Sequence, residues 1–187
     1  MMQIEEINER FNDELFKQIE GLLPKYHTYT LGTPSAILQS VQIPDLPIEL
    51  RASRLNDKAM QETHPFDLQE IMDLPIVVQN PLAIFRSATH IGRYVIMIEL
   101  EHNKKNYIVA IQTKRNNNNA IVNDIRSIHY RNSNSHIANW INENLVDYAN
   151  KEKMAEWFSK QQYNSAEVRK LFNHATKIIQ NFENAKL

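Results

Sequence analysis

The chain has no cysteine and only three glycines among its 187 residues. Without cysteine it can form neither disulfides nor a catalytic thiolate, and a structural zinc site is disfavoured. The three glycines, Gly21, Gly32 and Gly92, are too few and too far apart for a glycine-rich phosphate loop. Dinucleotide-binding and P-loop classes are therefore excluded.

Long apolar runs are also missing. No segment approaches the roughly 20 apolar residues that a membrane span needs, and the N-terminus MMQIEEINER is acidic and amphipathic, unlike a signal peptide. The absence of cysteine suits a reducing compartment. We expect no membrane partner and a location in the cytoplasm of a host cell.

The charges almost balance. Twenty-one basic and 22 acidic residues give a net charge of −1, so no global basic excess draws the chain to nucleic acid. Any nucleic-acid site must be local. The hydrophobic fraction of 42% and the length fit one globular domain with a substantial core. We expect a single domain over residues 1–187.

Hydrophobic periodicity predicts a helical N-terminal part. Apolar residues spaced by three and four indicate a helix over residues 3–23, which Gly21 and Pro24 would end. A proline-rich connection follows. The further expected elements are short helices at 35–40, 55–62 and 66–74, and a short strand at 47–52.

Alternating and continuous apolar patterns predict four strands in the middle of the chain. They cover residues 82–86, 94–100, 107–113 and 121–130. Short connections between consecutive strands favour antiparallel pairing, hence a four-stranded meander. Alternation in the last strand predicts one face for four residues: Asn123, Ile125, Ser127 and His129.

The C-terminal part has helical spacing. Ser135 is an expected N-cap for a helix that includes Leu145 and Tyr148, and residues 151–161 form a second helix. Ser165 caps a third. The predicted class is α+β, with N-terminal helices, a four-stranded antiparallel meander sheet and C-terminal helices.

The familiar motifs for metal and serine chemistry are missing. Seven histidines occur, but there is no H-E-x-x-H motif and no G-x-S-x-G nucleophile elbow. We therefore expect no metal site and no cofactor.

Metal-free phosphodiester cleavage needs a base, an acid and a cation that stabilises the phosphate. Histidine suits the first two roles because it titrates near neutrality, and Lys or Arg suits the third. Two clusters offer these groups. One holds Lys58 and His64, and the other holds Ser127, His129 and Arg131 on and after the last predicted strand.

Further polar residues stand at the ends of other predicted strands. Arg86 and Ser87 end one, and Thr113 ends another, so they are candidate substrate-binding or catalytic residues. Each candidate also has an ordinary structural interpretation. His64 before a proline is typical of a turn, and His129 near a strand end is typical of a surface residue.

Short motifs in a fixed order carry a resemblance to a known family. They are L-G-T-P at 31–34, P-I-E-L at 47–50, Lys58, His64-Pro65, D-L-P at 73–75, N-P-L-A-I-F-R-S at 80–87, I-V-A-I at 108–111, V-N-D-I-R-S-I at 122–128 and L-V-D-Y-A-N-K-E-K at 145–153. Over residues 30–155 the chain resembles the MuF C-terminal domain family of phages and mobile elements. Residues 1–24 and 156–187 would then be helical additions.

The resemblance implies a barnase–EndoU–colicin–RelE-like nuclease fold. It also implies a metal-independent endoribonuclease that serves as a phage-borne toxin or effector, with RNA as partner. By the resemblance, Lys58, His64, Ser87 and Ser127 fall on the family's functional positions. His129 stands where the family is expected to have an aromatic residue, so its role is not carried over.

Two other hypotheses stay open. A non-catalytic virion component or host-protein-binding module is favoured by the balanced charge and by the amphipathic terminal helices, which would contact the partner. It would place the chain in the virion. Transfer of a nucleotide or ADP-ribose group would require an aromatic-lined pocket. A distance between His64 and Ser127 within hydrogen-bond reach of one phosphate would favour the nuclease.

Overall fold

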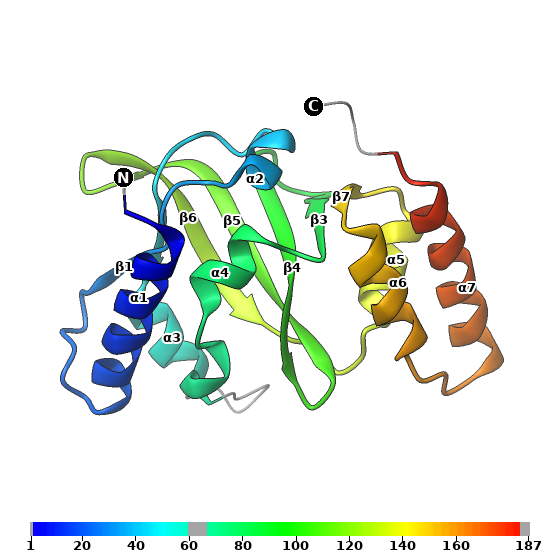
Figure 1. The fold of residues 1–187 in the computed structure, drawn as a ribbon, viewed down its shortest axis with the longest axis horizontal. Helices are drawn as coiled ribbons and strands as arrows, with labels where there is room; N and C mark the ends of the chain where they lie inside the picture. The colour runs from blue at the N-terminus through cyan, green and yellow to red at the C-terminus, as the bar shows by residue number, and fades with distance from the viewer. Residues whose placement is uncertain (1, 60–66, 184–187) are drawn as a thin grey trace.

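The computed structural model describes residues 2–59 and 67–183. Helices and strands are both present, which confirms the predicted α+β class (Figure 1). The helices are α1 (Ile4–Ile19), α2 (Ala36–Ser40), α3 (Ala52–Ala59), the 3₁₀ helix η1 (Leu68–Ile71), α4 (Leu74–Gln79), α5 (Ser135–Asn142), α6 (Lys151–Ser159) and α7 (Ala166–Asn181). The strands are β1 (Thr28–Thr30), β2 (Ile48–Arg51), β3 (Ala83–Arg86), β4 (Arg93–His102), β5 (Lys105–Asn117), β6 (Ala120–His129) and β7 (Val146–Ala149).

The expected four-stranded antiparallel meander is wrong as a description of the sheet. The described residues form a seven-stranded mixed sheet in the order β1-β2-β6-β5-β4-β3-β7. The four predicted strands pair with their neighbours in antiparallel fashion, but β2 lies parallel to β6, and β7 joins β3. The strand predicted at residues 47–52 is β2, whereas β1 and β7 were not predicted, because three or four residues are too few for a clear alternation pattern.

Strand β7 also corrects the predicted C-terminal helices. Leu145 and Tyr148 fit a helical stripe in the sequence, yet α5 ends at Asn142 and Asn144 has a φ of 58°. A left-handed residue interrupts a helix, and asparagine tolerates this conformation better than most residues. The chain then reverses, and Tyr148 pairs with Ile84 of β3.

One face of the sheet is covered by the N-terminal half of the chain. Helices α1 and α4 lie against this face in Figure 1, and a large apolar cluster fills the space between them and the sheet. Phe11 and Leu15 of α1 are fully buried beside Tyr29. Burial of each such side chain contributes roughly 2 kcal/mol to stability. This helix therefore belongs to the core.

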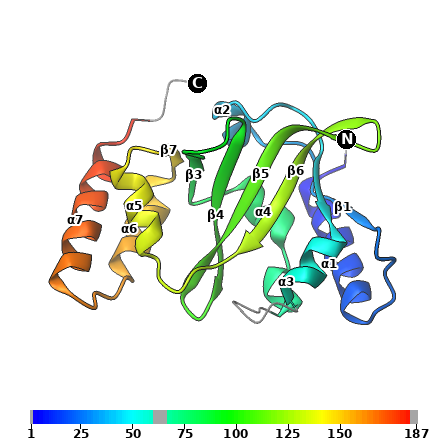
Figure 2. The ribbon, with the colours of Figure 1, turned by 180° about the vertical axis from the view of Figure 1, so that it is seen from behind.

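The other face is only partly covered. Helices α5, α6 and α7 form a second apolar cluster with β3, β7 and part of β4. Figure 2 shows that no described helix crosses the middle of β5 and β6 on this side. We call this exposed surface of β5 and β6 the open face. Helix α3 borders it next to β2 and β6.

Among the described residues, no helix is long and apolar enough to cross a membrane.

Candidate functional site

A β-bulge in β6 decides which side chains reach the open face. Ile125 pairs with Ile111 of β5, whereas Ser127 pairs with Ala110, the next residue along the partner strand. One extra residue, Arg126, is therefore accommodated between the two pairs. A bulge of this kind interrupts the alternation of side chains along a strand.

The predicted face of four residues is wrong for this reason. Ile125 belongs to the apolar cluster under the N-terminal helices, and Asn123 is fully buried beside it. Ser127 and His129, beyond the bulge, alternate with the buried Ile128 and therefore lie on the open face. The bulge thus separates the polar pair from the core.

Ser127 and His129 contact each other. The Ser127 Oγ and the His129 Nδ1 lie 3.3 Å apart, and both residues are half-buried. This contact holds the imidazole ring near the surface of the sheet. The two side chains therefore lie on the same face, and their predicted role at one site stays a prediction.

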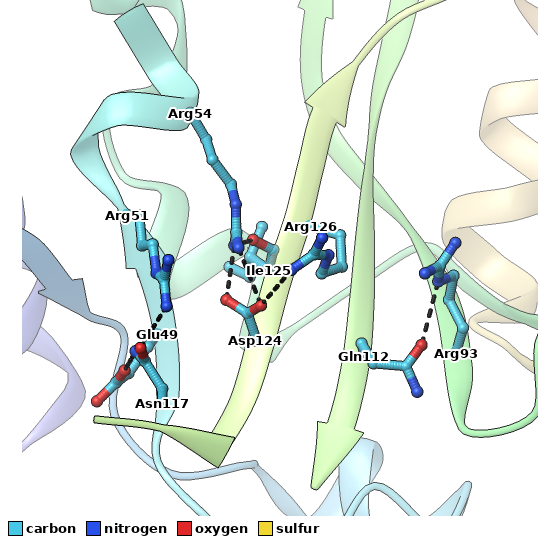
Figure 3. A network of polar contacts seen from close by, with 9 residues as sticks. All are labelled: Glu49, Arg51, Arg54, Arg93, Gln112, Asn117, Asp124, Ile125 and Arg126. Carbon is cyan, nitrogen blue, oxygen red and sulfur yellow. Dashed lines mark hydrogen bonds and ion pairs between the residues drawn. The ribbon is translucent and has the colours of Figure 1, made fainter. Parts of the chain in front are cut away.

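Asp124 lies on the same strand and binds two arginines (Figure 3). Arg54 of α3 donates from Nη1 at 2.6 Å and from Nη2 at 3.0 Å, one bond to each carboxylate oxygen. Arg126 donates to Asp124 Oδ2 at 3.0 Å. Arg54 also donates to the carbonyl oxygen of Ile125. These bonds fasten α3 to the middle of β6.

The cluster of Arg54, Asp124 and Arg126 carries one excess positive charge, because two guanidinium groups share one carboxylate. Burial by itself would raise the pKa of Asp124, but the hydrogen bonds and charges of the two arginines outweigh it. The pKa of Asp124 is therefore lowered, and the carboxylate stays ionised. Arg126 keeps 36% of its side chain exposed and can meet an anion from solvent.

A polar row continues across the sheet from this cluster. Gln112 of β5 is opposite Asp124, and Arg93 of β4 is opposite Gln112. The Arg93 Nε donates to Gln112 Oε1 at 3.2 Å, as Figure 3 shows. On the other side of Asp124, Glu49 is its partner on β2.

Arg86 and Ser87 are not beside Ser127. They lie at the end of β3 and just after it. Strands β4 and β5 lie between β3 and β6, so three strand spacings, roughly 14 Å, separate β3 from β6. Arg86 forms an ion pair with Asp147 at 2.5 Å. Ser87 Oγ accepts hydrogen bonds from backbone N–H groups within its own loop.

Thr113 and Arg131 have contacts with residues other than Ser127 and His129. Thr113 Oγ1 donates to the carbonyl oxygen of Gly92 at 3.0 Å and so holds the β3–β4 loop. The guanidinium of Arg131 lies over the Trp140 ring, 5.2 Å from its centroid. Both residues have structural contacts in addition to any role in binding.

The structure does not describe the side chains of the predicted cluster of Lys58 and His64. Lys58 lies near the end of α3, and its side chain is not among those described. His64 lies outside the described residues altogether. Their roles, and the distance between His64 and Ser127, stay predictions.

Arg54, Asp124 and Arg126 were not predicted from the sequence as site residues. A signal for two of them was present, since Asp124 and Arg126 are two apart on a predicted strand, within the motif V-N-D-I-R-S-I. The third could not be found in this way. Arg54 is 70 residues from Asp124, and only the packing of α3 against β6 brings them together.

Among the residues that the structure describes, no three His, Asp or Glu side chains gather as a metal site would require.

Comparison with protein families now adds to this geometry. The model of the phage MuF-C-terminal domain matches residues 55–156, just over half of the chain. The chain belongs to this phage family. The match confirms the resemblance drawn from the motifs, over a shorter range than the predicted 30–155. Comparisons with curated proteins and with solved structures gave no match.

The matched range of this MuF C-terminal domain runs from α3 to α6. It contains Asp124, Arg126, Ser127 and His129, and it begins one residue after Arg54. Strand β2, which pairs with β6, and helices α1 and α7 lie outside it.

Proposed function

We propose that this MuF C-terminal domain protein is a metal-independent endoribonuclease that acts as a phage-borne toxin or effector. One observation supports the proposal most directly. Ser127 and His129 contact each other on the open face of the sheet, on the same strand as a carboxylate bound by two arginines. A titratable group and an excess positive charge therefore lie on one strand of the open face.

The imidazole of His129 is the proposed general base. It takes the proton of a ribose 2′-hydroxyl, and the 2′-oxygen then attacks the adjacent phosphorus. The bond from phosphorus to the 5′-oxygen breaks, which leaves a 2′,3′-cyclic phosphate and a free 5′-hydroxyl. The departing oxygen requires a proton from an acid, and we propose His64 for this role on the sequence alone.

Arg126 and Arg54 are the proposed electrostatic partners of the phosphate. Charge accumulates on the phosphate oxygens in the transition state, and guanidinium groups held in place stabilise it. Asp124 keeps the two guanidiniums in place through three hydrogen bonds. The excess positive charge of the cluster offsets the repulsion that a lone carboxylate would exert.

Three further candidates have supporting roles in the proposal. Ser127 orients the imidazole through its contact with Nδ1. Lys58 is a proposed additional cation, supported by the family resemblance. Ser87 is kept as a proposal for substrate binding and not for the chemical step, because its strand is distant from β6.

The first test is RNA cleavage by the full chain with EDTA present. We expect cleavage of total RNA into products with cyclic phosphate ends, and none of an all-deoxy substrate. His129→Ala should lower the rate by about 10²- to 10⁴-fold, the usual contribution of a general base. His174→Ala, at an exposed position on α7, is the matched control and should cleave normally.

The test has clear negative outcomes. Absence of cleavage of any RNA would contradict the ribonuclease. Cleavage that EDTA abolishes, or that survives unchanged in both His129→Ala and His64→Ala, would contradict the mechanism. Expression in a host cell should arrest growth with the unaltered chain and not with His129→Ala if the protein is a toxin.

The alternative of a non-catalytic binding module also has a supporting observation. Large apolar side chains are exposed on α1 and just after it, namely Phe16 (44% exposed), Ile19 (38%), Leu22 (70%) and Tyr26 (89%). Exposed apolar residues gathered on one region are typical of protein contacts. If no RNA is cleaved, binding of a phage or host protein through this region becomes the better explanation.

A further inference from the structure

A second polar site lies at the opposite end of the row that begins at Asp124. It is a cleft of about 450 Å³ beside the loop that joins β3 to β4. Its polar lining comprises Ser40 and Gln42, at and just after the end of α2, together with Arg86, Ser87, His90, Arg93, Tyr94 and Asp147. None of these groups takes part in the proposed chemical step.

The loop beside the cleft is held in one conformation by β5. The carbonyl oxygen of Gly92 accepts hydrogen bonds from Thr113 N at 2.9 Å and from Thr113 Oγ1 at 3.0 Å. Gln112 Nε2 donates to the carbonyl oxygen of Ile91 at 3.3 Å. Gly92 has a φ of +73°, and a Cβ there would lie 3.1 Å from Thr113 Oγ1. This position therefore requires glycine.

The start of the loop is fixed as well. Ser87 Oγ accepts hydrogen bonds from the backbone N–H groups of Thr89 and His90, at 3.3 and 3.2 Å. Thr89 Oγ1 and His90 Nδ1 lie 2.7 Å apart. A binding site made by such a loop is preformed, so a ligand loses little affinity to ordering it.

The charges of the cleft suit an anion. Arg86 is paired with Asp147, so these two charges cancel. Arg93 instead binds the neutral amide of Gln112 and has no ion pair among the described residues. Its full positive charge therefore remains for a ligand, with the exposed His90 nearby.

Arg93 connects the cleft to the open face. It lines the cleft and is also the last member of the row Asp124, Gln112, Arg93 across β6, β5 and β4. Two strand spacings, roughly 10 Å, separate β4 from β6. A polyanionic chain that crosses the strands at Arg126 would therefore arrive at Arg93.

We infer that the cleft binds a second phosphate and its nucleotide when single-stranded RNA lies across β6, β5 and β4. The inference rests on the proposed ribonuclease and adds the form of its substrate, an extended strand of several nucleotides. Backbone phosphates that follow a basic track are typical of single-strand binding. Ile91, fully exposed on the loop, offers an apolar surface to a neighbouring base.

The test compares RNA of two lengths that cannot be cleaved. The probes are a fluorescein-labelled octauridylate and a diuridylate, both with 2′-fluoro groups in place of the nucleophilic hydroxyls. Fluorescence anisotropy measures their dissociation constants over a series of salt concentrations. We expect the octamer to bind at least tenfold more tightly than the dimer, because only the octamer reaches the cleft.

Arg93→Gln removes the unpaired charge and should weaken octamer binding about tenfold, the loss expected for one charge-assisted contact. The slope of log K against log salt should become shallower by about 0.7, which corresponds to one phosphate contact on a single strand. His90→Gln, at an exposed loop position, should change octamer binding in the same direction. Lys17→Gln on α1 removes a charge on the helix-covered side and should change neither quantity.

The outcomes separate this inference from the proposed function. Equal affinity for the two lengths, or an unchanged salt slope in Arg93→Gln with its melting temperature preserved, would overturn the subsite even if RNA is cleaved. A length advantage that depends on Arg93 without any cleavage of ordinary RNA would support the subsite and contradict the ribonuclease.

Discussion

At the scale of single residues, Asp124 has the most consequential contacts of the open face. Its carboxylate is almost fully buried, and it accepts two hydrogen bonds from Arg54 and one from Arg126. Removal of one partner from a buried ion pair leaves the others without compensation. Asp124 therefore determines both the position of α3 and the direction of the two guanidiniums.

Asp124→Asn should destabilise the protein by about 3 kcal/mol, because two buried or half-buried guanidiniums lose their counter-charge. Urea unfolding monitored by circular dichroism measures this. Glu99→Gln is a suitable control, since its ion pair with Lys153 involves a carboxylate that is 49% exposed. An effect of Asp124→Asn no larger than that of Glu99→Gln would contradict the structural role.

The same carboxylate predicts a response to acid. The pKa of Asp124 is lower in the folded protein than in the unfolded chain, so its contribution to stability is present above the unfolded value of about 3.9. That contribution is lost as the pH falls through the lower, folded pKa. Asp124→Asn should therefore flatten the dependence of unfolding free energy on pH below about 4.

We expect the protonation of His136 to lower the stability of the protein at a higher pH than that of Asp124 does. Burial lowers its pKa to about 4, and its Nε2 is buried with no hydrogen-bond partner, while Nδ1 contacts the Ser133 carbonyl oxygen. Between an unfolded pKa of about 6.5 and the folded value, the unfolded chain binds the extra proton. Stability should fall by about 2 to 3 kcal/mol between pH 7 and 4.5.

The check for His136 is urea unfolding at pH 7 and 4.5. His136→Phe keeps a ring beside Trp140 and removes the titration, so it should lose most of this difference. His174→Ala, at an exposed position, should retain it. Equal pH dependence in unaltered protein and in His136→Phe would show that another group is responsible.

At the scale of elements, α7 shows how a segment beyond the family match supports the fold. Phe172 is 2% exposed and packs against Trp157 and Phe158 of α6, with ring centroids 5.9 and 6.4 Å apart. Its neighbours on the same face, Ala175 and Ile179, are buried too. The helix therefore completes the apolar cluster on β3 and β7.

Phe172→Ala should destabilise the protein by about 3 to 5 kcal/mol, the usual cost of emptying a buried aromatic site. Thermal and urea unfolding measure the loss. Asn173→Ala, at the next and exposed position, is the matched control and should change stability by less than about 0.5 kcal/mol. Similar small effects in both variants would mean that α7 is only loosely attached.

The bulge in β6 is the other element of consequence. Regular alternation would have placed Ser127 on the same face as Ile125. Because Arg126 is an extra residue, Ile125 and Ile128 both point into the core. Ser127 and His129 point to the open face. One inserted residue thus assigns the polar pair to the open face.

At the scale of the whole molecule, one sheet supports two separate apolar clusters. The N-terminal helices fill one face, and the C-terminal helices fill part of the other, so β5 and β6 are left uncovered there. The overall charge is close to neutral, yet the row from Arg54 to Arg93 is locally basic. This agrees with the requirement that any nucleic-acid site be local.

Much of this arrangement could be read from local pattern. The strong alternation of residues 121–130 predicted a strand, the capping serine before Ala166 predicted the last helix, and the ordered motifs predicted the phage family. These are properties of neighbouring residues, and the chain needs no distant contact to express them. Ser127 and His129 were found as a pair for the same reason.

The remainder depended on contacts between distant residues. The partners of β2 and β7, the side of the sheet that Ser127 faces, and the union of Arg54 with Asp124 across 70 residues follow from packing and from a bulge. The sequence by itself determined the four central strands, the last helix, the family and the candidate polar residues, because periodicity and side-chain chemistry are local. The tertiary structure alone decided which of those residues meet, because strand order and register are set by the burial of the whole sheet.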